Sequence, residues 1–210
     1  MPFFDVSVPV HTKMPLYPGD PPMKFQFIRR LAHGDTSNNS WMSLGTHTGT
    51  HIDAPLHFLE DAAPVDRIPP DALVGPCVLV DAGDAPLVTR DVLRAAGIEK
   101  AQRVLVRTTN SAWIAREFRD DFVAFSEDGA RYLAEEVRPV LVGIDAPSLD
   151  PRGTEGHPAH MAILGSDTIR GAIEWLALGG LEPGPYTMFC GPLRLVGAEA
   201  APCRVLLSRL

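Results

Sequence analysis

The central part of the chain alternates short apolar runs with stretches of helical periodicity. Val78–Asp81, Val104–Arg107 and Val140–Asp145 are rich in valine, leucine and isoleucine, which predicts buried strands. Two helices are predicted between them, over 89–96 and 126–137, because each begins at a threonine or serine that can cap its first turn. This alternation indicates an α/β fold with at least partly parallel strand pairing.

The two ends of the chain have a different pattern. Phe25–Leu31 and Trp41–Leu44 are candidate strands within a proline-rich first third, and Tyr186–Cys190 and Arg204–Ser208 are candidate strands near the end. The pattern of Ser166–Leu178 fits a helix or a strand. Its isoleucines and leucine follow helical spacing, but the apolar run is too short to decide between the two. We therefore leave helix and strand open there.

Composition narrows the class of protein. The 210 residues carry a formal net charge of −7 and are 45% hydrophobic, which predicts one compact, soluble domain over 1–210. An acidic chain has no basic face, so we expect neither nucleic acid nor a membrane as partner. No signal peptide or membrane-spanning run is visible, and three cysteines without a C-x-x-C pattern favour a cytoplasmic location.

Three of the seven histidines fall within residues 47–57, together with an aspartate. The candidate ligands are His47, His51, Asp53 and His57. Their separations are all even, so in an extended chain their side chains point to the same side. A straight strand would hold the first and last roughly 33 Å apart, at about 3.3 Å per residue. A shared site therefore requires the chain to fold back, and Gly49 and Pro55 are positions where it can do so.

Imidazoles and a carboxylate are a suitable ligand set for Zn²⁺, Mn²⁺ or Fe²⁺ and leave positions for water. Such an ion lowers the pKa of bound water toward ~7. A single histidine is more often a surface or core residue, but the clustering here favours a metal site. A second group, His157 and His160, lies about a hundred residues later, with Glu174 beyond it. It suggests further ligands for the same ion or a neighbouring one.

The segment 47–57 resembles the H-x-G-T-H-x-D-x-P-x-H signature of the metal-dependent cyclase family, which includes bacterial kynurenine formamidases and isatin hydrolases. The likeness extends over most of the chain. Tyr17-Pro-Gly-Asp20 resembles the family's early aromatic-P-G-D turn, and residues 143–151 resemble the loop before its second histidine group. Residues 183–186 and 191–195 resemble its closing strands.

The resemblance implies a swivelling β/β/α fold and usually a homodimer, with one or two divalent ions, Zn or Mn, per subunit. Carried over by position, it implies that His47, His51 and Asp53 bind the first ion. Asp53 would bridge to a second ion held by His160 and Glu174.

Two further roles follow from the resemblance. His57 resembles the family's catalytic acid/base, and Tyr17 stands where kynurenine formamidases carry a substrate-contacting tryptophan. The fourteen residues from His160 to Glu174 are a longer separation than the family usually has.

The resemblance implies an enzyme that hydrolyses a small-molecule aryl formamide, such as N-formyl-L-kynurenine, to kynurenine and formate. Opening of a cyclic amide or lactone, as in isatin hydrolases, and polyketide-type cyclisation are alternatives, and a metal-binding protein without catalysis is a third. The sequence contains no G-x-S-x-G for a serine nucleophile and no phosphate-binding loop.

The remaining residues of interest are expected to be structural. Isolated His11 and His33 are predicted to be solvated or packed, and Asp145 and Asp150 suit a turn at the end of a strand, with a pocket role left open. We expect the other aromatic and thiol side chains to be core, interface or pocket-wall residues: Phe25, Phe27, Trp41, Phe58, Trp113, Trp175, Cys77, Cys190 and Cys203.

Overall fold

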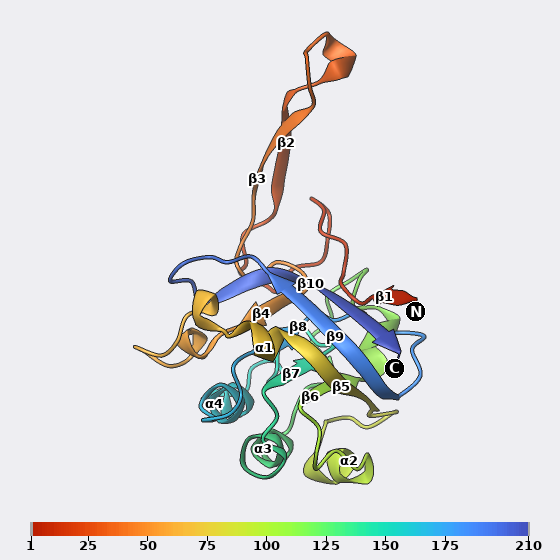
Figure 1. The fold of residues 1–210 in the computed structure, drawn as a ribbon. Coiled ribbons are helices and arrows are strands. Elements are labelled where there is room, and N and C mark those ends of the chain that lie inside the picture. The colour runs from red at the N-terminus through yellow and green to blue at the C-terminus, as the bar shows by residue number, and fades with distance from the viewer. Residues whose placement is uncertain (1, 210) are drawn as a thin grey trace.

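A closed barrel of seven strands forms the centre of the computed structural model, which describes residues 2–209 (Figure 1). In order around the barrel the strands are β10 (Ala200–Arg209), β4 (His51–Asp53), β8 (Ala172–Glu174), β7 (Leu141–Ile144), β6 (Arg103–Arg107), β5 (Val74–Asp81) and β9 (Gly184–Pro192). The barrel closes because β10 pairs with both β9 and β4. A short strand, β1 (Phe3–Asp5), adds to the free part of β10.

The predicted alternation of strands and helices is confirmed. Strands β5, β6, β7 and β8 are parallel neighbours. The helices are α1 (Pro70–Leu73), α2 (Arg90–Ala95), α3 (Glu127–Arg131) and α4 (Pro158–Leu164), and a π-helical segment, Tyr132–Val137, continues α3. Thr89 and Ser126 cap α2 and α3 as expected, since each side chain accepts a hydrogen bond from a backbone N–H of the first turn. Residues 2–209 contain no helix long and apolar enough to cross a bilayer.

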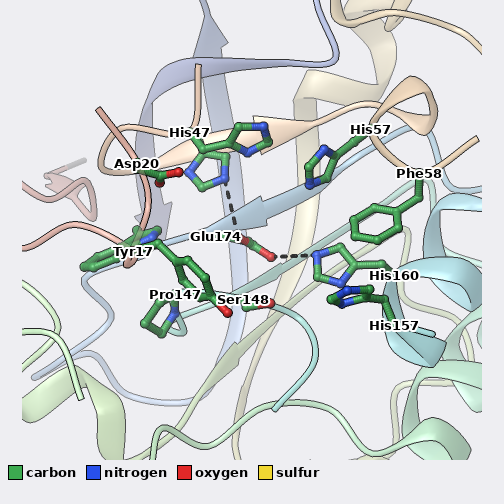
Figure 2. Close-up of a pocket in the computed structure, with 12 residues that line it drawn as sticks. Tyr17, Asp20, His47, His57, Phe58, Pro147, Ser148, His157, His160 and Glu174 are labelled. Carbon is green, nitrogen blue, oxygen red and sulfur yellow. Dashed lines mark hydrogen bonds and ion pairs between the residues drawn. The ribbon is translucent and has the colours of Figure 1, made fainter. Parts of the chain in front are cut away.

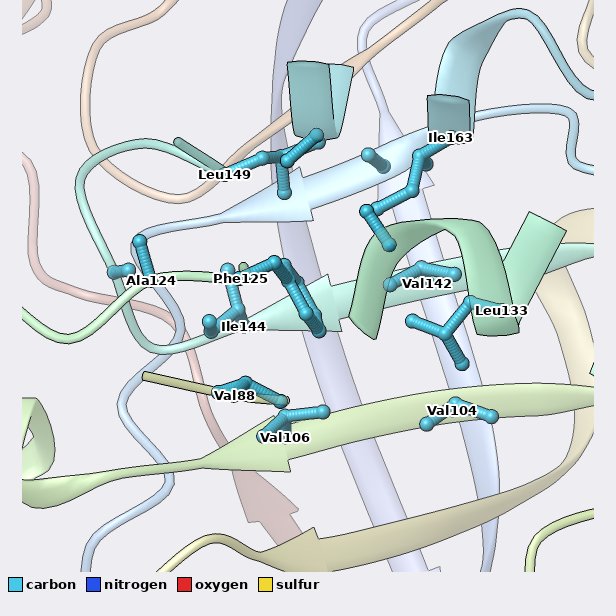
Figure 3. Packing of buried hydrophobic residues seen from close by; sticks show 14 of the residues in the cluster. Val88, Val104, Val106, Ala124, Phe125, Leu133, Val142, Ile144, Leu149 and Ile163 are labelled. Carbon is cyan, nitrogen blue, oxygen red and sulfur yellow. The ribbon is translucent and has the colours of Figure 1, made fainter. Parts of the chain in front are cut away.

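Two hydrophobic cores share the central strands. Val104, Val106, Val142 and Ile144 point from β6 and β7 toward the helices, where they meet side chains such as Phe125 (Figure 3). The alternate positions, such as Leu105 and Leu141, point into the barrel. Because both faces of these strands are buried, their sequences are continuously apolar.

The segment left open between helix and strand becomes a loop followed by β8. Ile169, Ile173 and Leu176 are all fully buried. Their helix-like spacing therefore reflects burial on several sides and not a helix. At Gly171, just before β8, an added Cβ would lie only 2.8 Å from the backbone oxygen of Asp53, so the chain entering β8 packs closely against the end of β4.

A β-hairpin projects from the barrel (Figure 1). Its strands, β2 (Lys24–Arg29) and β3 (Asn39–Ser43), confirm two of the expected strands, and every residue in them is exposed. The expectation that Phe25 and Phe27 belong to a core or pocket wall is wrong, and Trp41 is no core residue either: they are 46%, 41% and 50% exposed. The reason is that this two-stranded ribbon has no other layer of the chain packed against it.

The cysteines are free, and they differ in burial. Cys77 and Cys190 are buried, and Cys203 is half-buried. Burial raises the pKa of the Cys77 thiol to about 12, which agrees with its expected role as a small core residue.

Candidate metal centre and pocket

The chain folds back on both sides of β4, as the histidine spacing requires. Gly49 adopts a left-handed conformation with φ of 67° just before the strand, and Pro55 begins a single 3-10 turn, Pro55–His57, just after it. The ring centroids of His47 and His51 are therefore 4.8 Å apart, and those of His47 and His57 are 4.4 Å apart. The predicted reversal at Gly49 and Pro55 is confirmed.

Strand pairing and helix α4 bring the second group to the first. Glu174 on β8 lies opposite His51 on β4 in the register of these antiparallel strands. The Nε2 atom of His160, on α4, lies 3.2 Å from Oε1 of Glu174 (Figure 2). The loop between α4 and β8 accommodates the long separation between these two residues, so that they still meet.

Asp53 lies at the centre of this arrangement and is fully buried. Its Oδ1 atom is 3.0 Å from Nδ1 of His47 and 3.3 Å from Nε2 of His51. The Nε2 atom of His51 also lies 3.4 Å from Oε2 of Glu174. None of these three contacts has the geometry of a hydrogen bond, and both Asp53 oxygens and His51 Nε2 are buried without a hydrogen-bond partner. Such orphaned atoms are costly unless a ligand satisfies them, which is what a cation does.

Three groups of side chains place their ligand atoms within 4.8 Å of one another. They are His47, Asp53 and His57; His51, Asp53 and Glu174; and Asp150, His157 and His160. The first two groups share Asp53. A carboxylate between two such groups, surrounded by imidazole nitrogen and carboxylate oxygen, fits one or two divalent ions of the Zn²⁺ or Mn²⁺ type.

Hydrogen bonds behind the histidines fix the direction of their rings. Nδ1 of His51 lies 2.8 Å from the backbone oxygen of Gly49, and Nδ1 of His160 lies 2.5 Å from Oδ2 of Asp150. Each Nε2 therefore faces the centre. Asp150 is itself held in place, because it accepts hydrogen bonds from the backbone N–H groups of Ala159 and His160. The sequence predicts a turn at Asp150 but gives no local sign of this contact with His160.

Burial and close charges shift the pKa values of the cluster in opposite directions. Burial lowers the pKa of His51, but Asp53 and Glu174 outweigh it and raise the value to about 10. The same balance, with Asp150 and Glu174, raises the pKa of His160 to about 9. His57 differs, because burial dominates and lowers its pKa. The His57 imidazole is therefore neutral at pH 7 and can accept a proton.

A pocket of about 200 Å³ opens onto the centre (Figure 2). Its lining consists of Tyr17, Asp20, His47, His51, His57, Phe58, Pro147, Ser148, His157, His160, Glu174 and Trp175. The structure thus brings every predicted site residue to this pocket or, for Asp53, to its buried floor. Phe58, expected as core or pocket wall, stacks on His160 with ring centroids 4.4 Å apart.

Some residues in or beside the pocket have no functional signal in the sequence. Trp175, expected in the core or an interface, is 2% exposed and also lines the pocket, with a left-handed φ of 56° immediately after Glu174. Asp20 had been noted only as part of the Tyr17–Asp20 turn. Glu199 lies outside the pocket lining, 3.3 Å from Nε2 of His47. No local motif marks Trp175 or Glu199, because long-range packing brings them to the site.

Other candidates lie away from the pocket. His11 and His33 are exposed, as expected for isolated histidines. Asp145 is buried and accepts hydrogen bonds from Thr108 and Ser111. Burial raises its pKa to about 6 although these hydrogen bonds oppose the shift. This carboxylate stabilises the end of β7 and is absent from the pocket lining.

Comparison with known proteins agrees with this geometry. Residues 4–151 match the putative cyclase family. A kynurenine formamidase from Bordetella avium is 37% identical over 209 residues, which cover 99% of this chain and 98% of that protein. A solved structure described as a potential metal-dependent hydrolase with cyclase activity is 38% identical, with a TM-score of 0.86 over 98% of this chain and 96% of that one.

A more distant structure has the same fold. Isatin hydrolase A from Labrenzia aggregata is 23% identical, with a TM-score of 0.85 over 98% of this chain and 93% of that one. The family match covers most of the chain, and the formamidase covers nearly all of it. This protein belongs to the cyclase family.

Proposed function

We propose that this protein is a metal-dependent hydrolase that cleaves aryl formamides, with N-formyl-L-kynurenine as substrate and kynurenine and formate as products. The observation that supports the proposal is the pair of side-chain groups with the spacing of metal ligands, joined through Asp53 beneath a pocket that also holds a neutral imidazole, His57. The full-length likeness to kynurenine formamidases supports the choice of substrate.

Five residues are proposed to hold the ions: His47, His51, Asp53, His160 and Glu174. The orphaned atoms of Asp53 and His51 fit this assignment, since a cation supplies the partner that the chain does not. When bound, a divalent ion lowers the pKa of coordinated water toward ~7 and withdraws electron density from a carbonyl oxygen. We propose zinc or manganese with two ions per subunit, which elemental analysis of the purified protein tests directly.

His57 is proposed to move the proton. Its lowered pKa leaves it neutral at pH 7, so it can accept a proton from the attacking water. The same imidazolium can then donate this proton to the nitrogen of the departing aryl amine. Its place in the Pro55–His57 turn, beside His47, keeps the ring at the edge of the metal centre.

The aromatic residues of the pocket are proposed to orient the substrate. Tyr17 and Trp175 both line it, and Tyr17 is held edge-on against Phe118 with ring centroids 5.5 Å apart. Aromatic walls favour a flat aryl ring and exclude water from the reacting bond. Tyr17 is therefore the proposed substrate-contacting residue.

The test is a panel of N-formyl-L-kynurenine, isatin and simple aryl formamides incubated with metal-loaded protein. The proposal expects kcat/KM to be highest for N-formyl-L-kynurenine. Preferred turnover of isatin would instead assign ring opening. Bound metal with no turnover of any member would assign a metal-binding protein that lacks catalysis.

We also propose that two copies associate through the β2–β3 hairpin, in the cytoplasm. Phe25, Phe27 and Met42 share one face of the ribbon, and Trp41 lies on the other. An isolated two-stranded ribbon is only marginally stable in water, so a covering partner is expected. The partner we infer is a second copy of this chain.

The distribution of charge supports a second copy of this chain as the partner of the hairpin. The hairpin carries Lys24, Arg29 and Arg30 against a single acidic residue, Asp35, whereas the whole chain has a formal net charge of −7. The basic ribbon of one copy therefore complements the acidic body of another. An apolar groove at the base of the hairpin, lined by Val10, Leu44, Leu193 and other residues, offers a place for it.

A further inference from the structure

Asp20 places a carboxylate in the wall of the pocket without a partner from the chain. Within residues 2–209 it forms no ion pair and its side chain accepts no hydrogen bond. In Figure 2 it lies on the side of His47 and Tyr17, whereas Phe58 and His157 form the opposite side. An acidic group at the wall of a binding pocket, left unpaired by the protein, is available to a ligand.

A tight turn fixes the position of this carboxylate. The backbone N–H of Asp20 donates a hydrogen bond to the carbonyl oxygen of Tyr17 at 3.0 Å. Gly19, between them, adopts a φ of 109°, which a side chain rarely permits. The turn thus couples Asp20 to Tyr17, so that an aromatic group and a negative charge are presented together.

Asp20 is separate from the candidate metal ligands. It belongs to none of the three groups whose ligand atoms lie within 4.8 Å of one another. Burial raises its pKa, and the partial compensation comes from His47 and His51 at longer range. Its carboxylate is therefore partly buried without a hydrogen-bond or ion-pair partner among residues 2–209.

The other residues that line the pocket indicate the charge of a ligand group that could pair with Asp20. No lysine or arginine lines it, and the inner imidazoles already face carboxylates. Apart from the candidate metal ligands, Asp20 is thus the charged side chain of the lining that is left for a substrate group to pair with. A substrate ammonium would form a charge-assisted hydrogen bond with it, whereas a neutral substrate would leave a partly buried carboxylate unpaired.

We propose that Asp20 is a specificity residue that binds the α-ammonium group of an amino-acid aryl formamide. This inference rests on the proposed function and adds to it a reason why the enzyme selects substrates that carry a free amino group. Neutral aryl formamides and isatin-type rings offer no cation to Asp20.

Steady-state kinetics of Asp20→Asn with two matched substrates test the proposal. N-formyl-L-kynurenine carries the ammonium group, and 2-formamidoacetophenone has the same formamide and aryl ketone without it. We expect kcat/KM for the first substrate to fall about 10- to 100-fold, mainly through KM, because a hydrogen bond to a charged group is lost. For the neutral substrate the change should stay within about 2-fold, with metal content unchanged, since Asp20 makes no contact that this substrate uses.

Two control variants test whether the effect depends on the negative charge at position 20. Asp20→Glu keeps the charge and should restore part of the loss for N-formyl-L-kynurenine. Asp84→Asn removes an exposed carboxylate in a distant loop and should leave both substrates unaffected. Equal losses for both substrates in Asp20→Asn would overturn the proposal, because the residue would then act on the reacting groups. An unchanged KM for N-formyl-L-kynurenine would overturn it as well.

A binding measurement separates this proposal from the proposed function. Calorimetric titration with the product L-kynurenine and with 2-aminoacetophenone reports binding of the α-amino-acid group even if no substrate is turned over, and the comparison with Asp20→Asn assigns the part due to the ammonium. Wild-type protein should prefer L-kynurenine, and Asp20→Asn should lose that preference. Absence of any preference in the wild type would refute the role of Asp20, whereas absence of hydrolysis with the preference intact would refute only the formamidase activity.

Discussion

At the scale of single residues, the metal centre depends on which nitrogen of each imidazole faces inward. His51 is directed by the backbone oxygen of Gly49, and His160 is directed by the Asp150 carboxylate. In both histidines, Nδ1 is engaged by the hydrogen-bond partner on the outer side, and Nε2 is left to bind an ion. Partners of this kind keep a ligand in the right tautomer and orientation, so their removal weakens metal binding without removing a ligand.

Asp150→Asn is expected to lower metal affinity by about 10- to 100-fold, because an amide holds His160 less firmly and does not raise its basicity. Competition with a chelator of known affinity measures the effect. Asp145→Asn is the matched control, since it removes a buried carboxylate of the same region that contacts hydroxyl and amide groups but no imidazole. Equal metal affinity in wild type and Asp150→Asn would show that Asp150 is only a turn residue.

His51→Ala is expected to lose bound metal, because it removes one of the buried nitrogen atoms that face Asp53 and Glu174. Elemental analysis of the purified variant measures this, alongside circular dichroism to show that the barrel is folded. Full metal occupancy in a folded His51→Ala protein would contradict the ligand assignment.

His57→Ala is expected to lower kcat by about 10²-fold or more while metal content is retained, because it removes a general acid/base and not a ligand. The pH profile gives a second readout. Burial lowers the pKa of His57, so wild-type activity should fall as pH drops through a value below the usual ~6.5. In the variant the contribution of His57 to this acidic limb should be absent, and only the limb due to coordinated water, near pH ~7, should remain. Lost metal would reassign His57 as a ligand, and unchanged kcat would remove it from the mechanism.

At the scale of elements, the site depends on how closely β8 lies against β4. These short strands carry Glu174, His51 and Asp53, and their register places the first two opposite each other. Gly171 permits the approach, since a Cβ there would lie 2.8 Å from the Asp53 backbone oxygen and 3.0 Å from the Ile52 side chain. The proposed metal ligands on these strands are thus positioned by a residue that has no side chain of its own.

Gly171→Ala is expected to destabilise the protein by about 1–3 kcal/mol and to weaken metal binding, because β8 must move away from β4. Denaturant unfolding and metal titration measure the two effects. Gly191→Ala on β9 is the control, since its added Cβ would lie 3.7 Å from the nearest atom, an ordinary contact. If both variants behaved alike, close packing at Gly171 would not be what holds the two strands in register.

The sequence predicts these elements unevenly. Local signals identify α2 and α3, whose capping hydroxyls lie next to their helices, and the buried strands β5, β6 and β7. They do not identify β8, because Ile169, Ile173 and Leu176 are buried from several sides and so show no strand alternation. Trp175 is not predicted as a pocket residue for a related reason, since only contacts between distant segments bring it there, whereas Asp20 reaches the pocket in the same turn as Tyr17.

At the scale of the whole molecule, closure of the barrel joins segments that are far apart in sequence. Strand β10 pairs with β4, so that Pro202 lies opposite His51, and it also pairs with β9. No local pattern predicts such pairings, although the family resemblance implied the fold. In the β2–β3 hairpin the local pattern predicts the strands but not their environment. Its strands were predicted correctly, but their exposure depends on the absence of any other layer of this chain over the ribbon.

The paired substitution Phe27→Ser and Trp41→Ser is expected to convert a dimer into a monomer, because it removes one large apolar side chain from each face of the hairpin. Light scattering after size-exclusion chromatography measures the mass. Val196→Ser, which changes an 87% exposed side chain outside the hairpin, is the control and should remain dimeric. A wild-type monomer, or a doubly substituted protein that stays dimeric, would contradict the proposed association.

The central claim is that the Asp53-centred cluster activates water for hydrolysis of an aryl formamide when it holds divalent metal. The most direct measurement titrates metal into chelator-treated protein while following hydrolysis of N-formyl-L-kynurenine. We predict no turnover without metal and a rate that rises with bound ion until the site is saturated. Folded protein that is saturated with zinc or manganese and still does not hydrolyse this substrate would contradict the claim, as would full activity after the metal is removed.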